Sequence, residues 1–375
     1  MHAGNAGGAI YRSLVAVIDE NAGNRDEIAK ALASFYRVAD YPDVEMAIGR
    51  LRTPPAAVVV DERVRVPDRG LLVRTLRDAH VLKDVPIIVC RARSRSIEDI
   101  GRTSGDVEPD ALLEKPFRRS ELINLVSGLI NRKVEDGWAH LPPGPQKSLR
   151  ETLAIFHGFA DLIEHGEPLS QEKLNATCAP LLEVVTASQY QHVLRGVRGH
   201  DNYSYVHSVR VATLLTLFGF TIGLKESALM ILATGGLVHD IGKMVIPHHV
   251  LNKPGKLTAE EWAVVRGHVK LSSDYLRKFS DVPKGVLTIA TQHHERLDGS
   301  GYPNGLTMDK LNDLARMAAI VDVFAALTER RTYKAAMTPD EAFALMTEEM
   351  AGQLDLRLLK LFQEIFHDAV VREAV

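Results

Sequence analysis

The sequence predicts a two-domain protein in which an α/β domain with a doubly wound parallel sheet is followed by an all-α helical bundle. The first observation is length, because the chain has 375 residues and single hydrophobic cores rarely grow beyond ~250 residues. The second is an alternation of short β-branched runs with amphipathic patterns in the first third of the chain, which is typical of βαβ units. The third is the loss of strand signals from residue 147 onward. We expect domains at 1–132 and 148–375, joined by a linker at 133–147.

The α/β domain is expected to alternate strands with helices. Its clearest strands are "SLVAVID" at 13–19, "AAVVVD" at 56–61, "VPIIVC" at 85–90 and "DALLEK" at 110–115. Between and after them, "NRDEIAKALASFY", "DRGLLVRTLRDAH" and "RRSELINLVSGLI" carry apolar residues at spacings of three and four, as amphipathic helices do.

The second domain begins after "KVEDGWAHLPPGPQK", whose prolines and glycines predict a break in regular structure. One helix face beyond it is marked by Leu149, Leu153, Phe156, Phe159 and Ile163. Similar spacing recurs in "YVHSVRVATLLTLF", "ALMILATGGLVHDIG", "WAVVRGHVKLSSDYL" and "LARMAAIVDVFAAL". We therefore expect this domain to be almost entirely helical.

Composition gives no sign of a nucleic-acid or membrane partner. The net charge is -3, with 46% hydrophobic and 25% charged residues, so no electrostatic argument favours binding to nucleic acid or to an anionic membrane. The two cysteines, Cys90 and Cys178, form neither a disulfide framework nor a cysteine-based zinc motif, which fits a reducing cytoplasm. The start "MHAGNAGGAIYRS" lacks the pattern of a signal peptide, and the run "VATLLTLFGFTIGL" is too short to span a bilayer.

Charged residues end several predicted strands of the first domain. Asp19 and Glu20 follow the first strand, Asp61 ends "AAVVVD", and Lys115 ends "DALLEK". Because the carboxyl ends of parallel strands converge on one crevice, these side chains are expected to meet there. Carboxylates that hold Mg²⁺ beside a lysine would make Asp61 a candidate phosphoryl acceptor. The alternative is that each acid only ends a strand beside a turn.

Residues 13–130 resemble a response-regulator receiver domain, with Asp61 at the phosphoacceptor position. The resemblance implies a sensor histidine kinase as a partner and Mg²⁺ in the crevice. The segment "VPIIVCRA" departs from the family, because Arg91 stands where Thr or Ser is usual. Arg91 is expected either to pair with Asp61, imitating a phosphorylated site, or to point to solvent.

The second domain contains a set of histidines and aspartates within or at the ends of apolar helical segments. Its members are His207, His239, Asp240, His268, His293, His294 and Asp322. Burying ionisable groups without partners is costly, and a lone buried histidine is more often a hydrogen-bonded core residue than a ligand. Imidazoles and carboxylates projecting inward from several helices are how bundles build dinuclear metal centres. With Asp240 bridging, one ion would take His207, His239 and Asp322 and the other His268, His293 and His294.

Two such metals suit hydrolysis of a phosphate ester, because they acidify a shared water and stabilise the entering and leaving oxygens. Lys243 lies three residues after Asp240, on the same face of a helix. Its ammonium could neutralise a phosphate oxygen or protonate the leaving alkoxide. The alternative for Lys243 is a solvated lysine at a helix end.

The His-Asp pair in "LVHDIGK" with a later Asp is similar to the HD phosphohydrolase superfamily. Residues 200–345 resemble its HD-GYP subfamily, on the motifs "LVHDIGK", "IPHHVLNKPGKLT", "HHERLDGSGYP" and "YKAAMTPDEAF". The resemblance implies hydrolysis of the bacterial messenger cyclic di-GMP to pGpG, with GMP as a further product. It also implies that the loop with Gly299, Gly301, Tyr302 and Pro303 borders the substrate, with Tyr302 facing a guanine. Without the resemblance this loop would be read as an ordinary turn.

The resemblance also assigns phosphate binding to Arg331 and Lys334 in "ERRTYKAAM". The chain departs from the usual pattern at four positions, where Val245, His248, Ala325 and Thr332 replace a usual Gly, Asp, Asp and Pro. Tyr203 stands one turn before His207, where some relatives carry a Glu that helps to bind a third metal, so two ions are expected.

The sequence therefore predicts a cytoplasmic signalling enzyme with two divalent ions, in which a receiver-like domain controls the phosphodiesterase. Iron or manganese suits the inferred six-coordinate site better than zinc. Two alternatives remain: a catalytically inactive module that binds cyclic di-GMP or a partner signalling enzyme, and an enzyme for a different cyclic dinucleotide. A homodimer is a further option, without a recognisable seam in the sequence.

Overall fold

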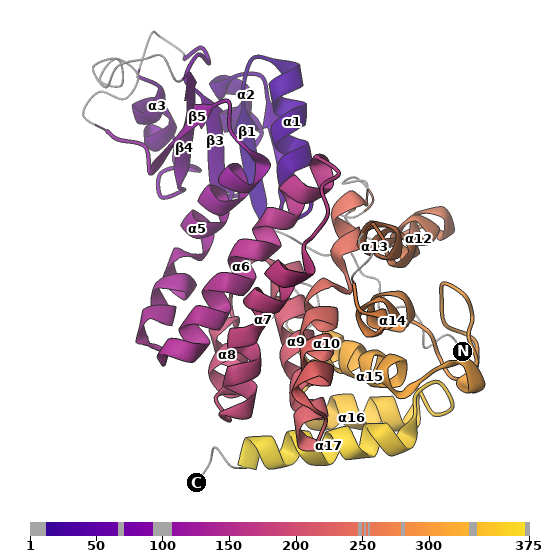
Figure 1. Cartoon of the computed structure of the whole chain (residues 1–375). Coiled ribbons are helices and arrows are strands. Elements are labelled where there is room, and N and C mark those ends of the chain that lie inside the picture. The colour runs from indigo at the N-terminus through magenta and orange to yellow at the C-terminus, as the bar shows by residue number, and fades with distance from the viewer. Residues whose placement is uncertain are drawn as a thin grey trace. The chain divides into compact units, whose positions relative to one another are not determined.

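The structure is a computed structural model that describes residues 13–66, 71–92, 107–246, 250, 253, 256–278, 282–329 and 336–371. The chain divides into two compact units (Figure 1). The N-terminal unit contains the described residues up to Asp136 together with His200–Asn202. The helical unit contains Gly137–Gly199 and the described residues from Tyr203 onward.

The N-terminal unit is built on a parallel sheet of five strands in the order β2-β1-β3-β4-β5. The strands are β1 (Leu14–Ile18), β2 (Arg37–Tyr41), β3 (Ala57–Asp61), β4 (Ile87–Ala92) and β5 (Ala111–Lys115). The doubly wound order 2-1-3-4-5 confirms the predicted α/β fold. The strand β2, "RVADY", was not among the predicted strands, because it lies at the edge of the sheet and is only partly buried, so it lacks a continuous apolar run.

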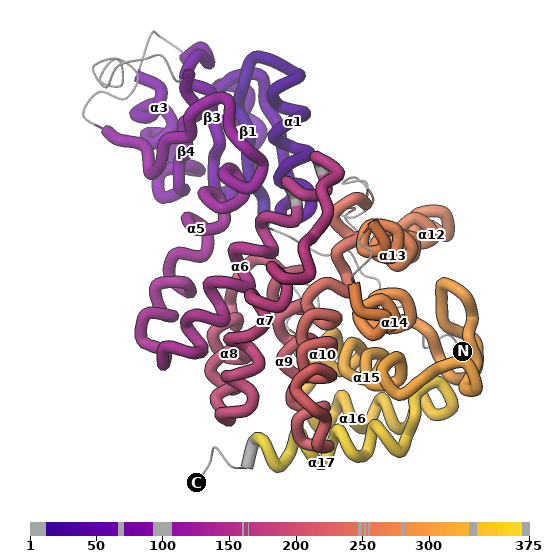
Figure 2. The backbone as a smooth tube through the Cα atoms, in the orientation of Figure 1, coloured from indigo at the N-terminus to yellow at the C-terminus, as the bar shows by residue number. Residues whose placement is uncertain are grey.

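Helices cover both faces of this sheet. They are α1 (Ala22–Leu32), α2 (Val44–Arg50), α3 (Leu72–Asp78) and α5 (Arg119–Gly137). Ile18, Val60 and Val89 face a core shared with α2 and α3. Successive strand residues point to opposite faces, and Val17 and Val59 on the other face are fully buried as well. The backbone tube in Figure 2 shows the helices packed around the strands.

The segment expected as a linker at 133–147 is mostly helical. The helix α5 continues to Gly137, the 3₁₀ helix η2 spans Trp138–His140, and only two residues separate η2 from α6 (Pro143–Glu164). Pro143 occupies the first turn of α6, where proline is tolerated because that N–H has no partner in the helix. Trp138 is buried and its indole N–H donates to the Gly196 carbonyl at 2.8 Å. The prolines therefore start a helix instead of ending regular structure.

The helical unit confirms the predicted all-α architecture. Its further elements are α7 (Gln171–Thr186), α8 (Tyr190–Gly196), α9 (Tyr203–Thr221), α10 (Glu226–Val238), η3 (Ile241–Val245), α12 (Ala259–Arg266), α13 (His268–Leu276), α14 (Lys284–Gln292), η4 (Met308–Lys310), α15 (Asp313–Thr328), α16 (Pro339–Glu348) and α17 (Leu356–Val371). The helices α9, α10, α14 and α15 pack against one another, with α13 against η3 and α14 (Figures 1 and 2). Leu149 and Phe159 on α6 are fully buried, as the predicted helix face requires.

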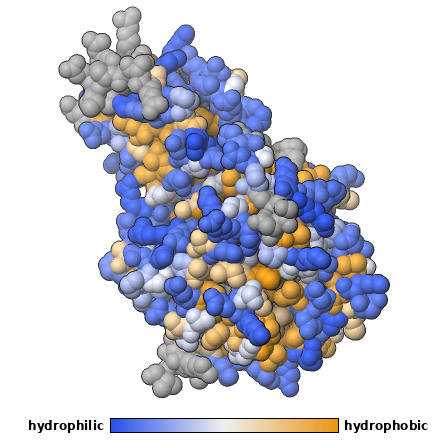
Figure 3. All heavy atoms as spheres, in the orientation of Figure 1, coloured by the Kyte–Doolittle hydropathy of each residue, from blue (hydrophilic) through white to orange (hydrophobic). Residues whose placement is uncertain are grey.

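Within the described residues, one segment, Glu226–Val245, has the length and apolar composition of a membrane span. The share of its most apolar window that is buried inside the unit is 67%, as in the core helix of a globular domain. Apolar and hydrophilic residues are intermixed on the face shown in Figure 3.

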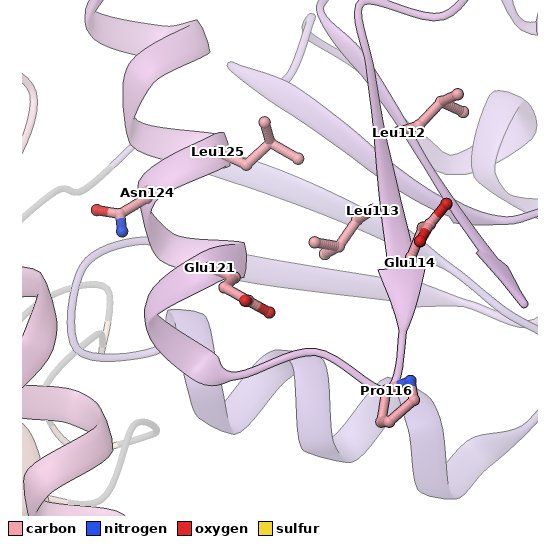
Figure 4. A pocket seen from close by; sticks show the side chains of 7 residues that line it. All are labelled: Leu112, Leu113, Glu114, Pro116, Glu121, Asn124 and Leu125. Atoms are coloured by element: carbon pink, nitrogen blue, oxygen red, sulfur yellow. The ribbon is translucent and has the colours of Figure 1, made fainter. Parts of the chain in front are cut away.

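A pocket lies in the N-terminal unit between β5 and the start of α5 (Figure 4). It is lined by Leu112, Leu113, Glu114, Pro116, Glu121, Asn124 and Leu125. Its lining includes none of the residues proposed for metal binding or phosphorylation, so we assign it no role in either.

Candidate metal centre

Two neighbouring groups of histidines and aspartates lie in the helical unit. One group is Asp240, His268, His293 and His294, and the other is His207, His239 and Asp322. Within each group the ligand atoms lie within 4.8 Å of one another. The fold therefore brings together all the side chains that the sequence analysis proposed as metal ligands, in the same division as the proposed split.

Asp240 lies between the two groups. Its Oδ1 is 3.1 Å from His268 Nε2 and 3.8 Å from His293 Nε2. Its Oδ2 is 3.5 Å from His239 Nε2 and 3.9 Å from His207 Nε2. One carboxylate thus offers an oxygen to each group, which is the arrangement that a bridging ligand needs.

Asp322 also faces both groups, which the sequence analysis did not anticipate. Its Oδ1 is 3.0 Å from His207 Nε2 and 3.8 Å from His239 Nε2, within its own group. Its Oδ2 is 3.6 Å from His294 Nδ1, which belongs to the other group. Two carboxylates therefore lie among five imidazoles, and either could connect the two groups.

Hydrogen bonds orient three of the histidines toward the cluster. The Nδ1 atoms of His239, His268 and His293 lie 2.8, 2.7 and 3.1 Å from the carbonyls of Gly236, Val265 and Ile289. A carbonyl only accepts, so each Nδ1 carries the proton and each Nε2 presents a lone pair. The Nε2 atoms of His239 and His293 are buried and make no hydrogen bond within the described residues, and His268 Nε2 faces Asp240 Oδ1 at 3.1 Å.

Electrostatics keeps most of these groups in the forms that bind metals. Burial raises the pKa of Asp240, but the nearby Lys243 and His239 outweigh this effect and hold the pKa well below its usual range. Burial likewise raises the pKa of Asp322, but His207 outweighs it and holds that pKa well below its usual range. Burial lowers the pKa of His293 to about 3. The carboxylates are thus ionised and His293 is neutral near pH 7.

His207 differs, because it has acidic neighbours on both sides. Burial lowers its pKa, but Glu329 and Asp322 outweigh that effect and raise the pKa to about 9. Binding of a cation at Nε2 would therefore release a proton from His207.

The donor set fits divalent metal ions. Buried imidazole nitrogens without a hydrogen bond, beside ionised carboxylates, are costly unless a cation satisfies them. Nitrogen and oxygen ligands of this kind suit iron, manganese, zinc and similar ions. The residues of both groups could therefore hold metal.

Lys243 lies beside the centre, in the 3₁₀ helix η3 and not in a continuation of α10. Its ammonium forms an ion pair with Oδ2 of Asp240, and its side chain is 21% exposed. The neighbouring Gly242 allows η3 to approach α13 closely, since a Cβ at this position would lie 2.1 Å from the His268 carbonyl oxygen. Ser272 accepts from the Gly242 N–H and donates to the His239 carbonyl, at 2.9 and 3.0 Å, and so fixes the turn after His239.

The Gly-Tyr-Pro loop is held against the centre by its own backbone. A Cβ on Gly301 would lie 2.4 Å from Arg296 N, so this glycine is required by packing within the chain. The buried carboxylate of Glu295 accepts from the backbone of Asn304 and Leu306 at 2.8 and 2.9 Å. Glu295 therefore fixes the loop around Pro303, a role that the sequence analysis missed.

Tyr302 stacks on His294, with ring centroids 4.6 Å apart and an interplanar angle of 30°. The guanidinium carbon of Arg266, an exposed residue at the end of α12, lies 5.2 Å from the centroid of the Tyr302 ring. The sequence analysis did not single out Arg266, although it lies two residues before His268. An exposed cation and an aromatic ring thus adjoin the candidate ligands.

Two predicted substrate contacts, Arg331 and Lys334, lie outside the described residues, as do Thr332 and His248, two of the departures from the family pattern. Of the other departures, Val245 is exposed and Ala325 is buried. Tyr203 stacks on His207, with ring centroids 5.8 Å apart.

In the N-terminal unit, three of the four predicted crevice residues meet. Lys115 Nζ lies 2.5 Å from Asp61 Oδ2 and 3.3 Å from Asp19 Oδ2, and both carboxylates are buried. Glu20 instead accepts from the backbone N–H of Arg65 at 3.0 Å. Arg91 forms an ion pair with Glu114 at 2.5 Å. Neither of the two expectations for Arg91, pairing with Asp61 or pointing to solvent, included this contact.

Comparisons with known proteins identify the family to which the chain belongs. A model of the HD domain matches residues 186–358, a stretch that contains both candidate ligand groups. Over 303 residues the chain is 36% identical to the cyclic di-GMP phosphodiesterase response regulator RpfG of Xanthomonas campestris pv. campestris, covering 80% of this chain and 72% of that protein. The chain belongs to the HD domain family. The match to this response regulator covers 303 residues, which is more than the segment from 137 to 375 contains. It therefore includes part of the N-terminal unit as well as the helical unit.

Two other relatives match shorter parts of this HD-domain chain. It is 36% identical over 192 residues to a cyclic di-GMP phosphodiesterase of Pseudomonas aeruginosa, covering 50% of this chain and 46% of that protein. It is 37% identical over 153 residues to 3′3′-cGAMP-specific phosphodiesterase 3 of Vibrio cholerae, covering 41% of this chain and 33% of that protein. The chain thus spans less than half of the length of these two relatives.

Proposed function

We propose that this HD-domain protein is a metal-dependent phosphodiesterase that hydrolyses cyclic di-GMP to pGpG. The observation that carries the proposal is the pair of ligand groups connected by Asp240, with buried imidazole nitrogens that lack a hydrogen bond within the described residues. Two relatives named as cyclic di-GMP phosphodiesterases support the choice of substrate.

The proposed centre would hold two divalent ions, iron or manganese, through nitrogen and oxygen ligands. His207, His239 and Asp322 would hold one ion, His268, His293 and His294 the other, and Asp240 both. When bound, such ions supply an acidified water and neutralise phosphate charge. In the balanced reaction, water forms a bond to phosphorus, the bond from phosphorus to the ribose O3′ breaks, and O3′ receives a proton.

Residues of the chain have distinct proposed roles in this reaction. The Lys243 side chain is partly exposed beside Asp240, so its ammonium can donate to a phosphate oxygen or to the leaving O3′. Arg266 and Tyr302 form an exposed cation and aromatic pair beside His294, suited to contact a phosphate or a guanine. Pro303 with Gly301, and Arg331 with Lys334, keep their proposed substrate roles. Hydrolysis of pGpG to GMP is a further step of the same chemistry.

The test is incubation of the protein, loaded with Mn²⁺ or with Fe²⁺ under anaerobic conditions, with cyclic di-GMP, followed by chromatographic detection of pGpG and GMP. Product formation that is abolished by a chelator and restored by metal is expected. Binding of cyclic di-GMP without product would overturn the enzymatic proposal and favour a binding module. A protein that takes up no metal would refute the proposed metal centre and, with it, the proposed enzyme.

A second candidate substrate is 3′3′-cGAMP, since three Vibrio cholerae relatives with 33–38% identity are named as specific for it. The two substrates differ in one base, so discrimination would come from contacts to that base and not from the metals. Equal incubations with each dinucleotide, compared by kcat/KM, decide between them.

We further propose that the N-terminal unit regulates the enzyme in the cytoplasm through phosphorylation of Asp61 by a sensor histidine kinase. The pair of Asp19 and Asp61 would hold Mg²⁺, and Lys115 would contact the phosphoryl group. Treatment with acetyl phosphate and Mg²⁺ should retard wild-type protein in a phosphate-affinity gel but leave Asp61→Asn unchanged. Equal mobility of treated and untreated wild type would refute this part of the proposal.

A further inference from the structure

His207 differs from the other oriented histidines in its position on a helix. His239 and His293 follow the last residues of α10 and α14, and His268 follows the end of α12. Gly236, Val265 and Ile289, whose carbonyls lie at hydrogen-bond distance from the three Nδ1 atoms, belong to the last turns of these helices, where few carbonyls have a partner within the helix. Their orientation is therefore provided by the helix ends.

Among the described residues, the hydrogen-bond partner of His207 Nδ1 is not a carbonyl of this kind. His207 is the fifth residue of α9, which continues for a further 14 residues to Thr221, so the carbonyls around it are engaged by the helix. Its Nδ1 contacts a side chain instead, at 3.3 Å from Glu329 Oε2. On the other side of the ring, Nε2 lies 3.0 Å from Asp322 Oδ1. The imidazole is thus held between two carboxylates.

Glu329 is itself fixed in place. Its side chain is only 4% exposed, and Oε1 lies 3.1 Å from Arg210 Nε. Arg210 is one turn after His207 on α9, and its Nη2 donates to Thr328 Oγ1 at 2.8 Å. Since Glu329 contacts Nδ1, it lies on the side of the ring away from the candidate metal ligands, and it is suited to orient His207 and not to bind the ion.

We propose that Glu329 is a positioning residue that fixes His207 for binding of the ion shared with His239 and Asp322, with Arg210 fixing Glu329 in turn. This rests on the metal centre of the proposed function. A carboxylate that accepts from the distal N–H of a ligand histidine sets its tautomer and ring orientation and raises its basicity, and loss of such a group typically weakens metal binding ~10–100-fold.

The rival explanation is that Glu329 only neutralises the buried Arg210. Two double variants separate these roles. Both remove the ion pair between Arg210 and Glu329, and they differ only in whether an acceptor for His207 Nδ1 remains. Arg210→Met with Glu329→Gln keeps an amide oxygen that can accept from Nδ1, whereas Arg210→Met with Glu329→Ala has no acceptor. The full-length wild type and both variants are loaded with Mn²⁺, titrated with a chelator and analysed for metal content and by electron paramagnetic resonance, with circular dichroism as a check of folding.

The Gln variant should keep both ions with nearly wild-type affinity. The Ala variant should lose one ion at a chelator concentration ~10–100-fold lower, and its spectrum should change from a coupled pair to an isolated Mn²⁺ ion. Equal retention in both double variants, or equal loss in both, overturns the positioning role while leaving the proposed enzyme intact. A wild type that binds no Mn²⁺ refutes the proposed function and this inference together.

Discussion

Lys243 forms an ion pair with Oδ2 of Asp240, three residues before it in the chain. Asp240 is proposed as a metal ligand, whereas Lys243 is proposed to act on the substrate. Asp240 offers its other oxygen to His268, so this carboxylate contacts both the candidate ligand imidazoles and an ammonium. Removing each partner should therefore have different consequences for metal and for turnover.

Replacement of Asp240 should abolish both metal retention and turnover. Asp240→Ala removes the carboxylate that contacts both ligand groups and leaves Asp322 as the remaining carboxylate of the two groups. Metal analysis after dialysis, together with the cyclic di-GMP assay, measures both effects. Asp274→Ala on α13, where the aspartate pairs with Lys270 at an exposed position, is the control and should behave like wild type. An Asp240→Ala protein with full activity contradicts the assignment.

Replacement of Lys243 should separate metal binding from chemistry. Lys243→Ala leaves every proposed ligand in place, so the metal content should stay at the wild-type level. Turnover should fall by about 100-fold or more, as expected when a proton donor or a charge-stabilising group is lost from a transition state. Loss of metal to the same extent as in Asp240→Ala would show instead that Lys243 acts through the ligands.

Replacement of Arg266 should mainly weaken substrate binding. Its guanidinium is exposed over Tyr302 and has no place among the proposed metal ligands. In Arg266→Ala the KM should rise by about 10-fold or more, the effect of losing one hydrogen bond to a charged group, with little change in kcat. Lys270→Ala, an exposed cation on α13, is the matched control. An unchanged KM would exclude Arg266 from substrate contact.

Replacement of Gly301 should destabilise the helical unit. A Cβ at this position would meet three atoms of the backbone at 2.4–2.5 Å, and backbone cannot move aside as a side chain can. Gly301→Ala should therefore lower the free energy of unfolding by about 2 kcal/mol or more. Gly158→Ala on α6 has open space around the new Cβ and should be neutral or stabilising by about 0.5–1 kcal/mol. Thermal unfolding followed by circular dichroism compares the two, and equal midpoints would count against the packing argument.

Both cysteines should resist thiol reagents in the native protein. Burial raises the pKa of Cys90 and of Cys178 to about 12. Since the thiolate is the reactive form and appears only as the pH approaches the pKa, almost none exists at pH 8. Labelling with a chromogenic disulfide should be slow at pH 8 for native protein and rapid after addition of denaturant. Fast labelling of the native protein would show that one of these sites opens readily.

The sequence by itself determined the elements and the ligand types. Runs such as "AAVVV" at 56–60 are apolar throughout because parallel strands are buried on both faces, so β3 could be predicted from local pattern alone. The strand β2 could not, since an edge strand needs less apolar character and is stabilised by pairing with β1. The family-like motifs around His239 and His293 also indicated which residue types gather at the centre.

Only the tertiary structure decided how these residues face one another. It directs the two oxygens of Asp322 to different groups, pairs Arg91 with Glu114 instead of Asp61, and brings Glu329 to the distal nitrogen of His207. None of these contacts has a local signal, because each joins side chains far apart in the chain, whose approach depends on how whole helices and strands pack. Sequence pattern reports which face of an element is buried, whereas the partner of a buried polar group is set by the three-dimensional requirement that its hydrogen bonds and charge be satisfied.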